Sequence, residues 1–189
     1  MSFTIETNNP DQLYMIMNMV SHVLPMGNIC IKEDGLYISG LDTSHISYIE
    51  LELDKDYFTR YEMKCDIEKN DITLGISMNE LVKILKVSHA VDHLSLNYNT
   101  DDDNQLYLSF RGSGITRTYT LPLFDIENTV YEISRLDYPV ELEIKSKTLN
   151  NLLDSILITE TDQLMFKVNQ HKLSLCSNSD NINVNSNIN

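Results

Sequence analysis

The side chains that could bind a metal ion are few and poorly spaced. His89 and His93 stand four residues apart, as zinc ligands on one helix face can, but no Cys, Glu or third His lies at a suitable spacing. Asp101, Asp102 and Asp103 are similar to the start of a calcium loop, yet the Gly and the terminal Glu of that motif are missing. We therefore expect surface histidines, an acidic hairpin connection, and no metal or other cofactor.

Cysteine and nucleophile chemistry is equally unsupported. Cys30, Cys65 and Cys176 are odd in number, widely spaced and without a Cys-x-x-Cys pair, which predicts reduced thiols and no disulfide framework. The sequence has no Gly-rich phosphate loop with its Lys and no Gly-x-Ser-x-Gly elbow. These absences favour a protein that holds other molecules over an enzyme.

The charge balance limits direct binding to nucleic acid. The 189 residues include 14 Lys and Arg against 28 Asp and Glu, a formal net charge of −14. Tight binding to phosphates depends largely on Lys and Arg, so a high direct affinity for DNA or RNA is not expected. With 42% hydrophobic residues the composition is globular. No apolar run approaches the roughly 20 residues that span a bilayer, so no membrane partner is expected.

Three amphipathic helices are predicted, over residues 10–24, over 78–87 and from 146 onward. Asn9 and Pro10 are typical of a helix start, and Ser77 with Glu80 is typical of a capping box. The apolar triplets of the three helices recur every 68 residues: Leu13/Ile16/Met17, Leu81/Ile84/Leu85 and Leu149/Leu152/Leu153. This recurrence indicates a repeated unit, although any amphipathic helix can show such a triplet by chance.

Between the helices the apolar residues recur with a period of two, which predicts half-buried strands. The predicted strands are 3–7, 29–32, 36–39 and 46–53 in the first unit, 72–76, 94–98, 106–110 and 116–121 in the second, and 140–144, 164–168, 172–176 and 182–188 in the third. Each unit therefore has a strand, a helix and three more strands, joined by short connections that favour antiparallel pairing. The predicted fold class is α+β, with the helices on one face of antiparallel sheets.

The segment 124–138 is acidic, is closed by Pro139 and interrupts the repeat. We therefore predict a first domain of two units over residues 1–122, a connector over 123–139, and a partial second domain with the third unit over 140–189.

Three segments form an ordered set of motifs. Residues 40–47, Gly-Leu-Asp-Thr-Ser-His-Ile-Ser, resemble the Asp-Ser-Ser-His-Val-Ser stretch of the DNA sliding clamps of the proliferating cell nuclear antigen (PCNA) family. Residues 81–86, Leu-Val-Lys-Ile-Leu-Lys, resemble its Ser-Lys-Ile-Leu-Lys helix, and 123–127, Leu-Phe-Asp-Ile-Glu, resemble the start of its connector. The resemblance covers nearly the whole chain and implies the clamp fold. A full subunit would have a fourth unit, so we expect this chain to lack the last quarter.

The resemblance implies a DNA polymerase processivity factor. Three subunits would close a ring around double-stranded DNA, with the helices lining the hole, and would tether DNA polymerase and other replication and repair enzymes after a clamp loader has opened the ring. The expected location is the nucleus, or a viral replication site if a virus encodes the protein. The alternative is a clamp-fold transcription or checkpoint factor that does not encircle DNA by itself. That alternative would suit the outer face of the first helix, which has no Lys or Arg: Tyr14, Asn18, Ser21 and His22.

The resemblance also assigns three sets of site residues. The DNA-facing residues would be Asn79, Lys83, Lys86 and Lys147. A groove for short partner peptides would consist of Leu41, His45, Ile46, Ile126, Tyr131 and Ile133. Neighbouring subunits would pair through Thr116, Thr118 and Tyr119 of one strand and Ile182 and Val184 of another. The residues alone also allow an ordinary solvated helix face for the lysines and strand-end packing for Leu41 and Ile46.

Overall fold

The computed structural model describes residues 1–64, 71–87, 93–101, 104–127, 137–138, 140–159, 163–169, 172–178 and 183–188. The chain divides into two compact bodies, Met1–Ile133 and Ser134–Asn189, which are called the first and the second body below. The division falls inside the segment 123–139. Each body is described by itself.

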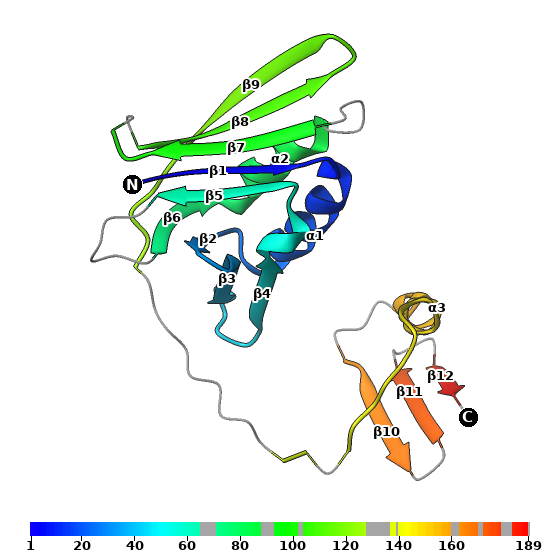
Figure 1. The fold of residues 1–189 in the computed structure, drawn as a ribbon. Helices are drawn as coiled ribbons and strands as arrows, with labels where there is room; N and C mark the ends of the chain where they lie inside the picture. The colour runs from blue at the N-terminus through cyan, green and yellow to red at the C-terminus, as the bar shows by residue number, and fades with distance from the viewer. Residues whose placement is uncertain are drawn as a thin grey trace. The chain divides into compact units, whose positions relative to one another are not determined.

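Two antiparallel sheets and two helices build the first body (Figure 1). The larger sheet has the order β5-β1-β7-β8-β9, with β1 (Ser2–Thr7), β5 (Arg60–Lys64), β7 (His93–Asn99), β8 (Gln105–Gly112) and β9 (Ile115–Pro122). The smaller sheet has the order β4-β3-β2-β6, with β2 (Met26–Lys32), β3 (Gly35–Leu41), β4 (Tyr48–Asp54) and β6 (Asp71–Ser77). The helices are α1 (Pro10–Val23), α2 (Met78–Leu85) and a short 3-10 turn, η1 (Lys55–Tyr57).

The two units of the first body exchange their first strands. β1 opens the first unit but pairs with β7 of the second, so that Ile5 lies opposite Leu96. β6 opens the second unit but pairs with β2 of the first, so that Leu74 lies opposite Ile29. Each unit therefore completes the sheet of the other, and the apolar face of each is covered by elements of both.

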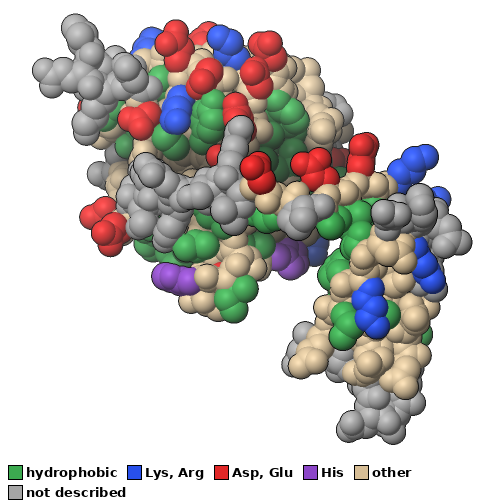
Figure 2. Space-filling view, turned by 90° about the horizontal axis from the view of Figure 1, so that it is seen from below, with side chains coloured by type: hydrophobic (Ala, Val, Ile, Leu, Met, Phe, Trp, Pro, Cys, Tyr) green, Lys and Arg blue, Asp and Glu red, His purple; other side chains and the backbone are tan. Residues whose placement is uncertain are grey.

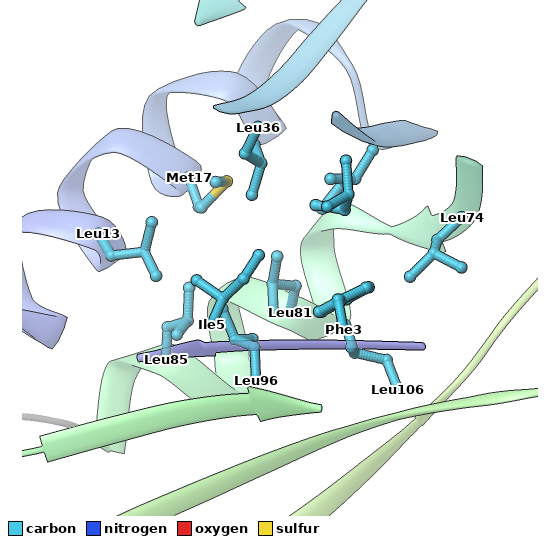
Figure 3. A pocket seen from close by; sticks show the side chains of 12 residues that line it. Phe3, Ile5, Leu13, Met17, Leu36, Leu74, Leu81, Leu85, Leu96 and Leu106 are labelled. Atoms are coloured by element: carbon cyan, nitrogen blue, oxygen red, sulfur yellow. The ribbon is translucent and has the colours of Figure 1, made fainter. Parts of the chain in front are cut away.

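The core of the first body lies between the sheets and the two helices. Side chains from both units point toward one another in it, as Figure 3 shows for Ile5, Leu13, Met17, Leu81 and Leu85. All five are nearly or fully buried. Fully burying one such side chain stabilises the fold by about 1.5–3 kcal/mol, so the two units hold each other together mainly through this core.

The second body has one helix on one face of a three-stranded sheet (Figure 1). Its elements are α3 (Ser146–Leu157), β10 (Met165–Asn169), β11 (Lys172–Asn178) and β12 (Asn183–Ile188), and the sheet order is β10-β11-β12. The hydroxyl oxygens of Ser155 on α3 and Ser186 on β12 lie 3.0 Å apart, which ties the helix to this face. Ile156 and Leu175 are buried.

The first two predicted units are present and the third is present without its first strand, and most elements agree with the sequence pattern within three residues at each end. β5 was not predicted, because it is a short strand at the edge of its sheet. Its signal was nevertheless in the sequence, since the half-buried Tyr61 and Met63 alternate with exposed polar residues.

One predicted strand is wrong. Residues 140–144 form neither strand nor helix, although Val140, Leu142 and Ile144 alternate with glutamates. In the first body, the first strand of each unit is held by the other unit of the pair. The described residues contain no fourth unit that could hold 140–144 in the same way, so the alternation alone does not produce a strand.

Two helix caps also differ from the sequence prediction. The Ser77 hydroxyl oxygen accepts a hydrogen bond from the Glu80 amide at 3.3 Å, which is half of the predicted capping box. The Glu80 carboxylate does not reach back, because it pairs with the Lys83 ammonium at 2.6 Å. Asn9 precedes α1 as predicted, but its side chain makes no cap and donates instead to Gln12 Oε1.

Candidate functional site

The exposed face of α2 carries the predicted basic residues. Asn79, Lys83 and Lys86 are exposed, whereas Leu81 and Leu85 of the same helix are buried in the core. The charge of Lys83 is partly compensated by its ion pair with Glu80. Among the described residues, Lys86 has no ion-pair partner. This face therefore offers less net positive charge than the sequence motif suggests.

The outer face of α1 differs in detail from the predicted one. Tyr14, Asn18 and Ser21 are half-buried, and the hydroxyl of Ser21 donates to the backbone carbonyl of Asn18 at 2.8 Å. The exposed side chains of α1 are Gln12, Met15, Met19 and His22. α1 thus presents two methionines and no Lys or Arg. Figure 2 shows one face of the molecule, on which Asp and Glu side chains are spread over the first body with some Lys and Arg between them.

Lys147 lies in the first turn of α3 and is exposed. It belongs to the second body, so a common DNA-facing surface of Lys147 with Lys83 and Lys86 stays a prediction.

The loop after β3 is held in shape by one carboxylate. Asp42 Oδ1 accepts hydrogen bonds from the amides of Ile46 at 2.8 Å and Ser47 at 2.9 Å, and Asp42 Oδ2 accepts one from the Ser44 hydroxyl. These bonds, with the one from Ser44 foremost, hold the pKa of the Asp42 carboxyl below its usual value. His45 is exposed at the tip of the loop with a φ of 59°. The loop therefore presents its side chains in a defined arrangement.

Five apolar residues on or beside the outer face of the smaller sheet are called the apolar patch below: Met26, Leu41 and Tyr48 on its strands, Ile46 in the loop after β3, and Ile126 at the start of the connector. Met26 and Ile46 are exposed, and the other three are half-buried. Strand alternation turns Met26 and Leu41 away from the core, and Leu41 lies opposite Tyr48 in the β3–β4 pairing. Ile46, in the loop, is 84% exposed. Exposed apolar side chains gathered at one place are typical of a surface that docks a partner.

Ile126 is positioned by the start of the connector, which lies along β6. The Phe124 amide donates to the Gly75 carbonyl at 2.8 Å, and Asn28 Nδ2 donates to the Ile126 carbonyl at 3.1 Å. A Cβ atom at Gly75 would come within 2.3 Å of the Phe124 carbonyl oxygen, so this close approach depends on glycine. Tyr131 and Ile133, which were predicted to extend the groove, lie outside the described residues.

Sequence reasoning missed Met26 and Tyr48. The signal was available in the alternation of β2. Ile29 and Ile31 are buried, so Asn28 and Cys30 face outward, and Met26 lies on the same face as these two residues. Such alternation places a residue on the outer face but does not say which outer residues lie together. That grouping came only from the pairing of three strands and the connector.

The strands predicted to join subunits are both at sheet edges. β9 pairs only with β8 among the described strands, and its Thr116 and Thr118 are exposed. The ring of Tyr119 contacts Phe110 edge to face, with 5.7 Å between the centroids. β12, which contains Val184, pairs only with β11 among the described strands. Ile182 lies outside the described residues. Edge strands carry unpaired backbone groups that can pair with another chain.

The remaining sequence candidates show no further site in the described part of the chain. No three or more His, Cys, Asp or Glu side chains gather there in a way that could hold a metal ion. His93 Nε2 lies 3.4 Å from Glu6 Oε2, whereas His89, Asp102 and Asp103 fall outside the described residues. The described helices include none long and apolar enough to cross a membrane.

The architecture matches solved clamp structures. PCNA from Thermococcus kodakaraensis superposes with a TM-score of 0.87 at 17% sequence identity, covering 98% of this chain and 72% of that structure. PCNA from Entamoeba histolytica superposes with a TM-score of 0.79 at 18% identity, covering 98% and 73%. The molecule therefore has the fold of the DNA sliding clamps, as the sequence resemblance predicted.

Sequence comparison adds the family. The sequence profile of the Rad9 family matches residues 13–189, and the chain belongs to this PCNA-like clamp family. It is 30% identical over 170 residues to the DNA polymerase sliding clamp of Methanothermobacter thermautotrophicus and 27% identical over 171 residues to that of Pyrococcus horikoshii. Each alignment covers 90% of this chain and 66% of the relative, so the chain spans slightly less than two thirds of the length of these relatives.

Proposed function

We propose that the chain acts as a DNA polymerase processivity clamp, a non-enzymatic ring subunit that encloses duplex DNA and tethers the polymerase to it. The observation that carries the proposal is the strand-exchanged pair of units in the first body, which is part of a fold like that of PCNA. The chain is also 30% identical in sequence to a protein named as a DNA polymerase sliding clamp.

Enclosure explains how such an acidic chain can work on DNA. A ring that surrounds the duplex is retained by topology, so it needs no strong attraction to phosphates. The net charge of −14 and the Lys83–Glu80 pair agree with weak direct contact, in which Lys86 provides most of the local positive charge on α2.

The apolar patch is the proposed docking place for partner peptides. Its most exposed member, Ile46, stands on the loop that Asp42 fixes, and Ile126 lies on the connector that β6 fixes. A short peptide with an aliphatic residue and paired aromatics could bury its apolar face there, as amphipathic turns do in apolar grooves. We expect such peptides in the DNA polymerase and in the clamp loader.

Ring assembly would use the two edge strands. We expect β9 of one subunit to pair with β12 of its neighbour in a head-to-tail arrangement, with three subunits closing the ring. The ring would work where DNA is replicated, in a nucleus or at a viral replication site.

Retention on DNA of different topology tests the proposal. The clamp and its loader are incubated with nicked circular plasmid, and gel filtration separates plasmid-bound clamp from free clamp. The plasmid is then linearised with a nuclease. A clamp stays with the circle and leaves after linearisation. Equal retention on circular and linear DNA would indicate ordinary DNA binding and contradict enclosure.

A second candidate is a clamp-fold factor that does not encircle DNA by itself. The lack of Lys and Arg on α1 and the ion pair of Lys83 favour it over a strongly sliding clamp. It predicts no loading onto the circle, together with undiminished binding of a partner peptide at the apolar patch.

A further inference from the structure

The outer face of β4 continues the apolar patch with two carboxylates. Tyr48, Glu50 and Glu52 lie on the same face of the strand, because successive side chains alternate and Leu53 is buried in the core. At about 3.4 Å per residue, Glu50 lies about 7 Å along the strand from Tyr48, and Glu52 lies the same distance further on. A peptide that covers the patch therefore reaches both carboxylates with the residues that flank its apolar segment.

These two carboxylates have no basic partner in the described part of the chain. Both side chains are exposed, and neither belongs to an ion pair there. Glu52 lies opposite Tyr37 in the β3–β4 pairing, and its Oε1 accepts a hydrogen bond from the Tyr37 hydroxyl at 3.2 Å. This bond holds the Glu52 carboxylate over the outer face without adding positive charge.

The surroundings of the patch are acidic on its other side as well. Asp125 and Glu127 stand on either side of Ile126 in the connector, and both are exposed. The four strands of the smaller sheet contain a single Lys or Arg, which is Lys32. Lys32 lies at the opposite end of β2 from Met26, about 20 Å along the strand. The patch is therefore bordered by negative charge that no nearby cation compensates.

We propose that the partner peptide of the apolar patch carries basic residues beside its apolar segment and places them against Glu50 and Glu52. This inference rests on the proposed function, because it adds a second recognition element to the same docking place. Charge complementarity on a surface that continues the patch identifies the partner as a peptide with an apolar segment and a basic flank. Opposite charges speed the encounter of such a peptide with the patch and fix its register, whereas a neutral or acidic flank gains neither advantage.

Arginine suits this site better than lysine. Its planar guanidinium can donate two parallel hydrogen bonds to one carboxylate, and the carboxylate of Glu52 is already held in place by Tyr37. The same negative charge repels phosphate groups. This face would therefore select basic peptides and keep DNA away from the docking place.

Calorimetry with matched peptides tests the proposal. All peptides contain the same segment with a Gln, an aliphatic residue and paired aromatics, and they are flanked at each end by either two Arg or two Gln. Both are titrated into the whole chain. We expect the Arg peptide to bind about fivefold more tightly at low salt, which is the size typical of one or two exposed ion pairs. The advantage should fade as added salt screens the charges.

Substitutions in the chain locate the contact. Glu50→Gln together with Glu52→Gln should reduce the advantage of the Arg peptide to about twofold, the rest being due to the connector carboxylates, and should leave the affinity for the Gln peptide unchanged. Glu33→Gln together with Asp101→Asn is the matched control, because it removes the same charge from two exposed positions in turns of the first body away from the patch. The control should keep the full advantage.

The outcomes separate this inference from the proposed function. Equal affinities of the two peptides, or an advantage of full size in the Glu50 and Glu52 double variant, would overturn the basic flank and leave the apolar docking place standing. Binding of neither peptide would overturn both. Glu50→Lys together with Glu52→Lys gives the reverse check, since it should favour a peptide flanked by Glu over the Arg peptide. An unchanged preference for Arg in that variant would contradict the contact.

Discussion

The first and second bodies are built from the same kind of unit but bury it to different degrees. Leu81 and Leu85 of α2 are buried, whereas Leu149 and Leu153, at the same positions of α3, are half-buried. The difference does not come from the local sequence, because the helices share their apolar pattern. It comes from the neighbouring helix, since α2 packs against α1 of the first unit, whereas α3 has no such partner helix among the described residues. One unit is therefore half of a folding domain.

The largest expected effect of this difference is on stability. Leu81→Ala should destabilise the first body by about 2–5 kcal/mol, because it opens a cavity in a filled core. Leu149→Ala should lower the free energy of unfolding of the second body by clearly less, because the Leu149 side chain is already partly in water. Urea unfolding, followed separately by probes in each body, measures both values. Equal losses would contradict the account of a half-covered helix.

The next effect concerns the apolar patch of the first body. Ile46→Ala should weaken binding of a peptide with a Gln, an aliphatic residue and paired aromatics by about tenfold, or about 1.4 kcal/mol, without changing the unfolding midpoint. Leu41→Ala and Ile133→Ala should weaken it too. Calorimetry measures the affinity. Met165→Ala is the matched control, an exposed apolar residue of the second body, and should bind normally.

A smaller effect is expected at the two lysines of α2. Lys83→Ala and Lys86→Ala should each reduce loading on circular DNA, because each removes one positive charge from this face, and the loss of Lys83 also leaves the Glu80 carboxylate without its partner. Both effects should fade with added salt, which screens exposed charges. Loading assays over a salt series measure them. Unchanged loading in the double variant would remove both lysines from the DNA-facing role.

The smallest effect is the pH dependence of the loop. The pKa of Asp42 is lowered in the folded chain, so the ionised carboxylate contributes stability above its ordinary pKa, and this contribution is lost as the pH falls through the lowered value. Peptide binding should therefore weaken only in acid. Asp42→Asn should bind less at neutral pH and show a flatter acid profile. Calorimetry from neutral to acidic pH measures it, and parallel profiles would contradict the role of the carboxylate.

Periodicity in the sequence predicted the elements well, because amphipathic helices and half-buried strands repeat their apolar residues at fixed intervals. It could not predict what depends on a distant partner. Residues 140–144 have the alternation of a strand, but no described strand pairs with them. The Glu80 carboxylate pairs with the Lys83 ammonium and not with the backbone at the start of the helix. The patch residues Met26 and Tyr48 stand on β2 and β4, and only the pairing of both strands with β3 brought them to the same part of the sheet.

Hydrogen exchange of the backbone amides tests most directly whether one unit is half of a domain. The account predicts strong protection in β1 and β6 at every protein concentration, because their partners lie in the same chain. Residues 140–144 of this chain should exchange freely, because no described strand pairs with them. Slow exchange of 140–144, or rapid exchange of β6, would contradict it.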